Sequence, residues 1–339
     1  MAFQLIFLDS FDHYATGNLA MKWTAPGTQS NIQASSARTG TQCLELSGPN
    51  GPQKAIGVQT NVIAGHAYLA PSLSGRIFIF YNTGTGDEII GSEINGDGSI
   101  SMYSTNSHIT IGTTAPGLVS IGAYVYLEYA IAWTPTTTTI WLRVNGLAIA
   151  PFNPFVGGVG PAQHCDLVVL SGVGAGGGSI HDDVYMGIST TPNTIQNDFL
   201  GPVRIYPYIP AENKTPLQWT PLAGTNFSEV NQVPPPGDTA YVADGTVGDI
   251  DQYRMAAISG QGPTGSFTIP CGQTVLCAKL DAAGSRIIAP DIGGHVGNDH
   301  ALGSDYLMYT DPYLINPVTG VPFVQGDFNT TFFGQKVTG

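Results

Sequence analysis

Apolar and polar residues alternate with a period of two along most of this chain, which is the pattern of β-strands that bury one face. Gly- and Pro-rich turns separate these short stretches. They predict strands at residues 3–8, 41–46, 54–62, 75–82, 87–94, 98–103, 124–133, 139–146, 166–171, 180–187, 198–206, 266–269, 275–280 and 304–310. The pattern shows no long amphipathic helix. Many short strands joined by such turns favour a β-sandwich.

The stretch at residues 139–146 shows the alternation most clearly. Ile140, Leu142 and Val144 share one face, so we expect them to point into the core. Trp141 falls on the opposite face, and Tyr126 falls on the outer face of the preceding strand. We therefore expect both aromatic side chains at the surface, where an apolar patch would need a partner to cover it.

A domain boundary is predicted in the Pro-rich stretch from Pro207 to Pro216. The alternation is looser beyond it, although the composition stays typical of strands. The sequence therefore predicts two β domains: a larger sandwich over residues 1–207 and a smaller β-rich domain over residues 208–339.

Composition narrows the possible functions. Only 10% of the residues are charged, 42% are hydrophobic, and Gly (44) and Pro (24) are abundant, as expected of an all-β protein with a sizeable core. The formal net charge of −13 argues against nucleic acid as a partner, because such binding needs a basic surface. No stretch approaches the roughly 18 apolar residues of a membrane span, so we expect no membrane insertion. A signal peptide is not expected either, because no basic region precedes the first apolar residues.

The four cysteines are too few for a disulfide scaffold. Cys43 and Cys165 fall in apolar stretches and are expected to be buried thiols. Cys271 and Cys277 could face each other across a hairpin, and the sequence leaves their pairing open.

Three motifs suggest chemistry but have a simpler structural interpretation. Residues 172–177 match G-x-G-x-x-G, yet a strand-like stretch and not a helix follows, so we expect a loop. Glu88 and Glu93 share one predicted strand, but a separation of five places them on opposite faces, which argues against a hydrolase pair. His295 and His300 lie in a Gly-rich loop whose spacing matches no standard zinc motif.

Several segments carry a resemblance to a known family. They are Phe11-Asp-His-Tyr14, Trp141-Leu-Arg-Val-Asn-Gly146 and His181-Asp-Asp-Val-Tyr185, followed by Phe199-Leu-Gly-Pro-Val-Arg204, Trp219-Thr-Pro221, Asn226, Gly237-Asp-Thr-Ala-Tyr-Val242 and Asp251-Gln-Tyr253. The first three resemble laminin-G or concanavalin-like sandwiches, and the later ones resemble structural proteins of tailed bacteriophages. The resemblance implies an antiparallel β-sandwich of the concanavalin/laminin-G-like jelly-roll type, with no catalytic motif.

In laminin-G-like folds the first and last strands pair, so the resemblance brings four acids into one region. They are Asp9, Asp12, Asp182 and Asp183. Clustered carboxylate oxygens could hold Ca²⁺. The alternative is that these acids accept backbone hydrogen bonds at turns and strand ends. No other cofactor is expected.

The function implied by the resemblance is that of a non-enzymatic structural protein of a tailed bacteriophage virion. It would sit on the tail or decorate the head surface, in multiple copies, after synthesis in the cytoplasm of the bacterial host. Its partners would be other virion proteins and copies of itself, as a homo-oligomer. The alternative is a carbohydrate-binding, lectin-like module that recognises a host or environmental glycan.

Overall fold

The computed structural model describes residues 3–15, 17–85, 87–104, 108–157, 164–172, 178–190, 195, 198–257, 265–281 and 284–339. Strands make up 47% of the structure and helices 6%, which confirms the predicted all-β class. Within these ranges, no helix is both long and apolar enough to cross a membrane.

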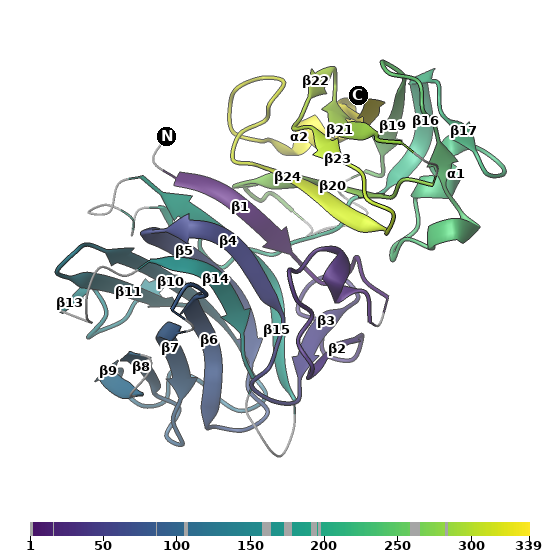
Figure 1. The fold of residues 1–339 in the computed structure, drawn as a ribbon. Helices are drawn as coiled ribbons and strands as arrows, with labels where there is room; N and C mark the ends of the chain where they lie inside the picture. Colours follow the sequence, from purple (N-terminus) through teal and green to yellow (C-terminus); the bar gives the residue numbers. More distant parts are fainter. Residues whose placement is uncertain are drawn as a thin grey trace. The chain divides into compact units, whose positions relative to one another are not determined.

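The chain divides into two compact units (Figure 1). The N-terminal unit consists of Met1–Phe11 and Thr16–Ile205, and the C-terminal unit consists of Asp12–Ala15 and Tyr206–Gly339. The sequence placed the boundary between residues 207 and 208, in the same stretch of chain, and gave residues 12–15 to the first domain. Each unit has its own sheets.

Two antiparallel sheets form the N-terminal unit, as predicted for a sandwich. The first sheet has the order β12-β11-β10-β5-β15-β3-β2, with β1 also paired to β15 and β13 to β11. Its strands are β1 (Phe3–Asp9), β2 (Ser30–Gln33), β3 (Cys43–Leu46), β5 (Asn61–Leu69), β10 (Tyr124–Trp133), β11 (Thr138–Val144), β12 (Leu147–Ala148), β13 (Phe155–Gly157) and β15 (Ser179–Ser189). A short 3-10 helix, η1 (Leu19–Met21), lies between β1 and β2.

The second sheet has the order β4-β14-β6-β7-β8-β9. Its strands are β4 (Gln53–Gln59), β6 (Gly75–Asn82), β7 (Asp87–Ile94), β8 (Ile100–Ser104), β9 (Ile109–Thr113) and β14 (Cys165–Leu170). Aromatic side chains join the two sheets across the core. Phe78 of β6 stacks on Tyr129 of β10 with ring centroids 5.1 Å apart, and Phe80 meets Trp133 edge-on at 6.3 Å. Such ring pairs add to the apolar area that the sheets bury.

The predicted hairpin of β10 and β11 is present, and its core face is confirmed. Leu142 lies opposite Tyr129, and Ile140, Leu142 and Val144 are all buried. The predicted surface position of Trp141 and Tyr126 is wrong, because these side chains are only 7% and 1% exposed. The outer face of the first sheet is therefore a second buried face.

The cover on this outer face comes from a segment that was predicted to be a strand. Residues 199–205, which we call the strap, form no strand. The Phe199 ring lies 4.5 Å from the guanidinium carbon of Arg143, which shares the face of Trp141. Pro202 lies against Gly146, where a Cβ would sit 3.4 Å from the proline ring. The polar contacts of the strap are described with the functional site.

The central strand β5 was largely missed by the sequence analysis. A single strand was expected over residues 54–62, whereas the chain turns at Thr60 and pairs again as β4 and β5. Nearly every residue of β5 is buried, because β5 lies between β10 and β15 and has the core on one face and the covered face on the other. A strand buried on both faces shows no alternation in its sequence.

The C-terminal unit contains three small antiparallel sheets. The largest has the order β16-β19-β25-β21-β22, with β23 also paired to β21; the others are the pairs β17-β18 and β20-β24. The strands are β16 (Pro210–Leu217), β17 (Thr220–Pro221), β18 (Val242–Ala243), β19 (Ile250–Met255), β20 (Gly272–Ala278), β21 (Ile287–Ile292), β22 (His295–Val296), β23 (His300–Ala301), β24 (Leu307–Tyr313) and β25 (Phe332–Val337). The helices are α1 (Asn226–Val230), α2 (Gln325–Thr330) and the 3-10 helix η3 (Gly237–Thr239).

Two sequence interpretations fail in this unit. Residues 266–269 form no strand. Cys277 lies within β20 and Cys271 directly precedes the same strand, so the two do not face each other across a hairpin. Both are free thiols, as are Cys43 and Cys165, which are buried as expected.

Replacing Leu142 with Ala tests the core face of β11. The side chain is fully buried, so Leu142→Ala should lower the free energy of unfolding by about 2–5 kcal/mol in chemical denaturation. Ile121 is 60% exposed, and Ile121→Ala should change that free energy by less than ~0.5 kcal/mol. Equal unfolding midpoints for the two variants would contradict the register of β11.

Candidate functional site

The most concentrated group of buried charges lies at a bulge in β15. The pairing with β5 steps from Asp182 opposite Ala67 to Tyr185 opposite Gly65, which leaves extra residues on β15. Asp183 has a φ of 50°, in the left-handed region. Aspartate tolerates this conformation better than most residues, and bulges redirect side chains. The Asp-Asp pair therefore suits the bulge.

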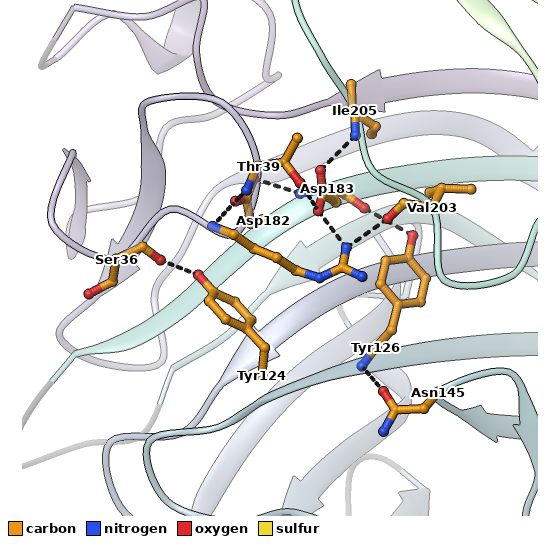
Figure 2. A network of polar contacts seen from close by, with 10 residues as sticks. Ser36, Thr39, Tyr124, Tyr126, Asn145, Asp182, Asp183, Val203 and Ile205 are labelled. Atoms are coloured by element: carbon orange, nitrogen blue, oxygen red, sulfur yellow. Dashed lines mark hydrogen bonds and ion pairs between the residues drawn. The ribbon is translucent and has the colours of Figure 1, made fainter. Parts of the chain in front are cut away.

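The carboxylates of Asp182 and Asp183 each accept three hydrogen bonds from the chain (Figure 2). The oxygens of Asp182 accept from the backbone N–H groups of Arg38 (2.7 Å), Thr39 (3.1 Å) and Asp183 (2.8 Å). Asp183 accepts from the Thr39 hydroxyl (2.8 Å), from Arg38 Nη1 (2.5 Å) and from the backbone N–H of Ile205 (2.7 Å). The last contact ties the end of the strap to the sheet.

Arg38 connects the same acids to the strap and to Tyr126 (Figure 2). Its Nη1 also donates to the backbone oxygen of Val203 at 2.7 Å. Its guanidinium lies 5.1 Å from the centre of the Tyr126 ring. The Tyr126 hydroxyl donates to the backbone oxygen of Asp183 at 3.0 Å. Tyr126 thus has polar and cation–π partners inside the protein.

Burial governs the charge of this acid pair. Burial and, to a smaller extent, the neighbouring charge of Asp183 together raise the pKa of Asp182 to about 8, against the backbone N–H donors. Burial likewise raises the pKa of Asp183, while the N–H of Ile205 and the Arg38 charge oppose the shift. Without Arg38 the two carboxylates would lack their charged partner.

A second buried carboxylate, Glu128 of β10, holds the middle of the strap. Its Oε1 accepts from the Tyr185 hydroxyl at 2.7 Å and from the backbone N–H of Gly201 at 2.8 Å. The Tyr185 ring reaches Glu128 over Gly65, where a Cβ would lie 2.2 Å from the ring. Burial raises the pKa of Glu128, against the hydrogen bond from Tyr185. Two acidic positions therefore fix the strap.

The four acids proposed for calcium do not form one site. β1 does pair with β15, with Asp9 opposite Val184. However, Asp9 accepts from Trp23 Nε1 (2.7 Å) and lies 3.5 Å from the Lys22 ammonium, and Asp12 groups with the C-terminal unit. Across the described ranges, no three or more His, Cys, Asp or Glu side chains are placed to hold a metal ion. The oxygens of Asp182 and Asp183 face N–H and O–H donors, which is the alternative that the sequence left open.

The outer face of the second sheet corrects the argument about Glu88 and Glu93. β7 carries a bulge, because Phe80 and Tyr81 of β6 pair with Ile90 and Glu88 and skip Ile89. The extra residue reverses the alternation, so Glu88 and Glu93 lie on the same face and not on opposite faces.

Three further side chains join these glutamates on that face. Arg76 forms an ion pair with Glu88, and His108 Nε2 lies 3.2 Å from Glu93. Tyr103 lies between them, with the His108 ring 4.2 Å away and the Arg76 guanidinium 5.6 Å away. The four charged side chains are 23–45% exposed. We call these five residues the polar face cluster.

The remaining candidate residues from the sequence lie in the His295–His300 loop and in the G-x-G-x-x-G match, and the described ones form no metal site. His300 Nε2 lies 3.1 Å from Asp311 in the C-terminal unit, and Asn298 donates to the same carboxylate at 2.7 and 3.0 Å. His295 stands edge-on to the Tyr313 ring at 6.4 Å. Most of the G-x-G-x-x-G match, residues 173–177, lies outside the described residues.

No protein-family model matches the chain, and no curated protein sequence does. Solved structures with a similar fold include a mutant Trypanosoma rangeli sialidase that displays trans-sialidase activity, at 10% identity and a TM-score of 0.37, with 57% of this chain and 32% of the sialidase covered. Domain 4 of a GH43 extracellular arabinanase from Geobacillus stearothermophilus has 14% identity, a TM-score of 0.36 and coverage of 58% and 98%. The galectin LEC-6 of Caenorhabditis elegans has 17% identity, a TM-score of 0.29 and coverage of 42% and 94%. The chain spans about a third of the length of the sialidase structures that it matches.

Removing the Arg38 guanidinium tests how far the strap depends on it. Arg38→Ala leaves buried carboxylates without their cation, so it should lower the free energy of unfolding by about 3–5 kcal/mol above about pH 8, where the pair is ionised. The loss should shrink as the pH falls below about 8, because protonation of the Asp182–Asp183 pair removes charge that needs a partner.

The matched control is Arg76→Ala, which removes a partly exposed ion pair of the same unit. It should change the free energy of unfolding by about 1 kcal/mol or less, because solvent screens such pairs. Urea titrations at several pH values measure both variants. Similar losses for Arg38 and Arg76 would show that the buried network does not hold the strap.

Proposed function

We propose that this chain is a non-enzymatic structural subunit of a tailed bacteriophage virion, on the tail or on the head surface, and that it works in multiple copies. The phage setting rests on the sequence resemblance. Assembly is supported by one structural observation, which is the apolar surface of the C-terminal unit.

The C-terminal unit buries few apolar side chains for its size. Within described residues 206–339, the buried ones are Tyr253, Ile288, Ala289, Ile292, Met308, Phe323 and Val337. The large apolar side chains that are exposed outnumber them: Leu217, Leu222, Val233, Val247, Val296, Leu307, Val318, Val321 and Val324. Contiguous exposed apolar patches mark surfaces that bind another protein, and we propose that these side chains contribute to such a surface.

The same unit has strands with unpaired edges, and exposed Leu307 lies on one of them. β20 and β24 pair only with each other, so each has an unpaired edge among the described strands, and all of β20 is half-buried. A groove of about 620 Å³ is lined by residues 266–270 and 322–326, and Val324 forms part of its wall. An isolated two-stranded ribbon is marginally stable, and unpaired edges favour association. Both features fit a unit that is completed by neighbouring subunits.

Aspartate substitutions on this surface test assembly. Val324 precedes α2 at its N-cap, where aspartate is a favoured residue, so Val324→Asp should leave the helix intact while charging the groove. We expect this variant, and Val321→Asp, to shift the native oligomer toward monomer in analytical ultracentrifugation. Ile121→Asp, at an equally exposed site of the N-terminal unit, is the control and should not change the oligomer.

The virion assignment has its own test. Mass spectrometry of purified phage particles should find the chain in multiple copies, and cryo-electron microscopy should place it at symmetric positions. A chain that stays monomeric at every concentration and is absent from the particles would refute the proposal.

A second candidate function, glycan binding, is favoured by the polar face cluster. Charged, partly exposed side chains beside aromatic rings offer hydrogen bonds to sugar hydroxyls, as ligand sites place a few polar groups around an apolar surface. Arg76, Glu88, Glu93 and His108 supply the polar groups. Glu88 is already in an ion pair with Arg76, and Glu93 already contacts His108, whereas a hydrolase needs an acid and a base across an open space.

Glycan arrays with wild type, Glu88→Gln and Glu93→Gln separate these roles. Under this second function, wild type binds a glycan, both variants lose that binding, and no protein releases product from polysaccharides. A wild type that binds no glycan excludes the second function, and product release that Glu93→Gln abolishes would refute the non-enzymatic role.

A further inference from the structure

Two histidines lie side by side in the core of the N-terminal unit. His66 of β5 and His181 of β15 are both fully buried. Their Nδ1 atoms are 3.1 Å apart, and their rings stack with centroids 5.0 Å apart. Neither histidine belongs to the strap, to its acid network or to the polar face cluster.

The contacts assign the protons of this pair. His181 Nε2 lies 3.0 Å from the backbone oxygen of Ser171, so it carries a hydrogen and donates. In a neutral ring its Nδ1 is then an acceptor, and His66 Nδ1 must donate to it. His66 Nε2 is left unprotonated, and it is buried without a hydrogen-bond partner among the described residues. Each ring is therefore neutral with one defined tautomer.

The side chains that stack on the pair carry no negative charge, and the backbone contacts of Ala67 and Ser171, which favour a protonated ring, do not outweigh burial. From β6, Phe78 stacks on His66 at 5.2 Å; from β10, Tyr129 stacks on it at 6.0 Å; from β5 itself, Tyr68 stands edge-on at 6.1 Å. The titratable groups among these are the two phenols. Burial raises the pKa of Tyr68 and Tyr129, so both phenols stay neutral. Among the described residues, no carboxylate forms a hydrogen bond or ring contact with either histidine.

The pair also joins the two sheets. His66 and His181 belong to the first sheet, whereas Phe78 belongs to the second, and Ser171 directly follows β14 of the second. The Ser92 hydroxyl of β7 donates to the Tyr129 hydroxyl at 3.0 Å beside the stack. A charge on either imidazole would therefore be buried between the sheets. It could reach water only if the sheets separated.

We propose that His66 and His181 form an acid-sensitive latch, which holds the two sheets together while both rings are neutral and releases them when a ring takes up a proton. A proton on His66 Nε2 would create a buried cation with no acceptor. A proton on His181 Nδ1 would set two N–H groups against each other at 3.1 Å. Both outcomes favour the open sandwich.

The sign of the pH dependence follows from the pKa values. Burial lowers the pKa of His181 to about 3 and lowers that of His66 well below its ordinary value, with the His181 ring adding to the shift of His66. The unfolded chain takes up both protons near pH 6.5. Stability from the pair is therefore complete above about pH 6.5 and is lost as the pH falls toward 3, with the folding constant dropping up to about 100-fold per pH unit for two protons.

Asp182 changes stability in the opposite direction over part of this range. Its pKa is raised to about 8, so its contribution is complete below the pKa of about 4 of an unfolded aspartate and is lost as the pH rises through 8. The wild-type curve alone therefore mixes the two effects. A comparison of variants isolates the histidines.

The experiment measures urea unfolding of the full chain by tryptophan fluorescence at pH values from 7 down to 4.5. His66→Gln/His181→Gln removes both titrating groups while keeping polar side chains, and His295→Asn removes an exposed histidine of the C-terminal unit. We expect the ratio of the wild-type folding constant to that of the double variant to fall up to about 100-fold per pH unit below 6.5, and the ratio to the His295 variant to stay nearly constant.

Histidine NMR on the wild type gives an independent measurement if the double variant does not fold. The ring resonances of His66 and His181 should not titrate in the folded chain near pH 6.5, and they should lose their native positions only together with the core. A buried ring that titrates near 6.5 while the core stays intact would overturn the latch. Parallel pH curves for wild type and a folded double variant would overturn it as well.

Discussion

The buried ion pair between Arg38 and Asp183 is the interaction on which the architecture of the N-terminal unit depends. It brings residues far apart in sequence to the outer face of the first sheet and anchors the strap there through Val203 and Ile205. Since the strap covers this face, the sheet is buried on both sides, unlike a sandwich sheet with one wet face. Burying carboxylates costs free energy. Hydrogen bonds to every carboxylate oxygen of Asp182 and Asp183 offset this cost.

The two faces of the first sheet use polar groups in different ways. On the outer face, the buried acids accept hydrogen bonds from the strap, from Thr39 and from Arg38, and burial raises their pKa values. On the core face, the two histidines are neutral, and His66 Nδ1 donates to His181 Nδ1 beside the ring of Phe78. The same sheet thus carries an acid network on its outer face and a neutral histidine pair in its core. As the pH falls, the stability contributed by the histidines decreases, whereas that contributed by Asp182 increases.

The sequence predicts what depends on local alternation. The hairpin of β10 and β11 and the inward position of Leu142 could be seen there because each strand alternates and the turn is short. β5 could not be predicted in this way, because a strand that is buried on both faces shows no alternation in its sequence. The face of the sheet on which Glu88 lies was mispredicted, because one inserted residue, Ile89, shifts the register. The spacing of residues along a strand gives no sign of such a bulge.

The functional residues were the hardest to find. Arg38 and Glu128 were not identified because each has a partner in the strap, whose sequence looks like a strand. Thr39 was missed because its partners, Asp182 and Asp183, are far from it in sequence. One signal was present: in a chain with 10% charged residues, Glu128 interrupts an otherwise uncharged strand. A lone charge in such a stretch implies a buried partner.

The strap also determines how the N-terminal unit would carry mechanical load. It is the last segment of that unit and leads directly into residue 206. Tension applied from the C-terminal side first reaches the bond between Ile205 and Asp183, then the contact of Val203 with Arg38, then that of Gly201 with Glu128. These contacts lie in series along the strap, so tension on the chain at residue 206 loads them one after another before it reaches the strands of the sheet.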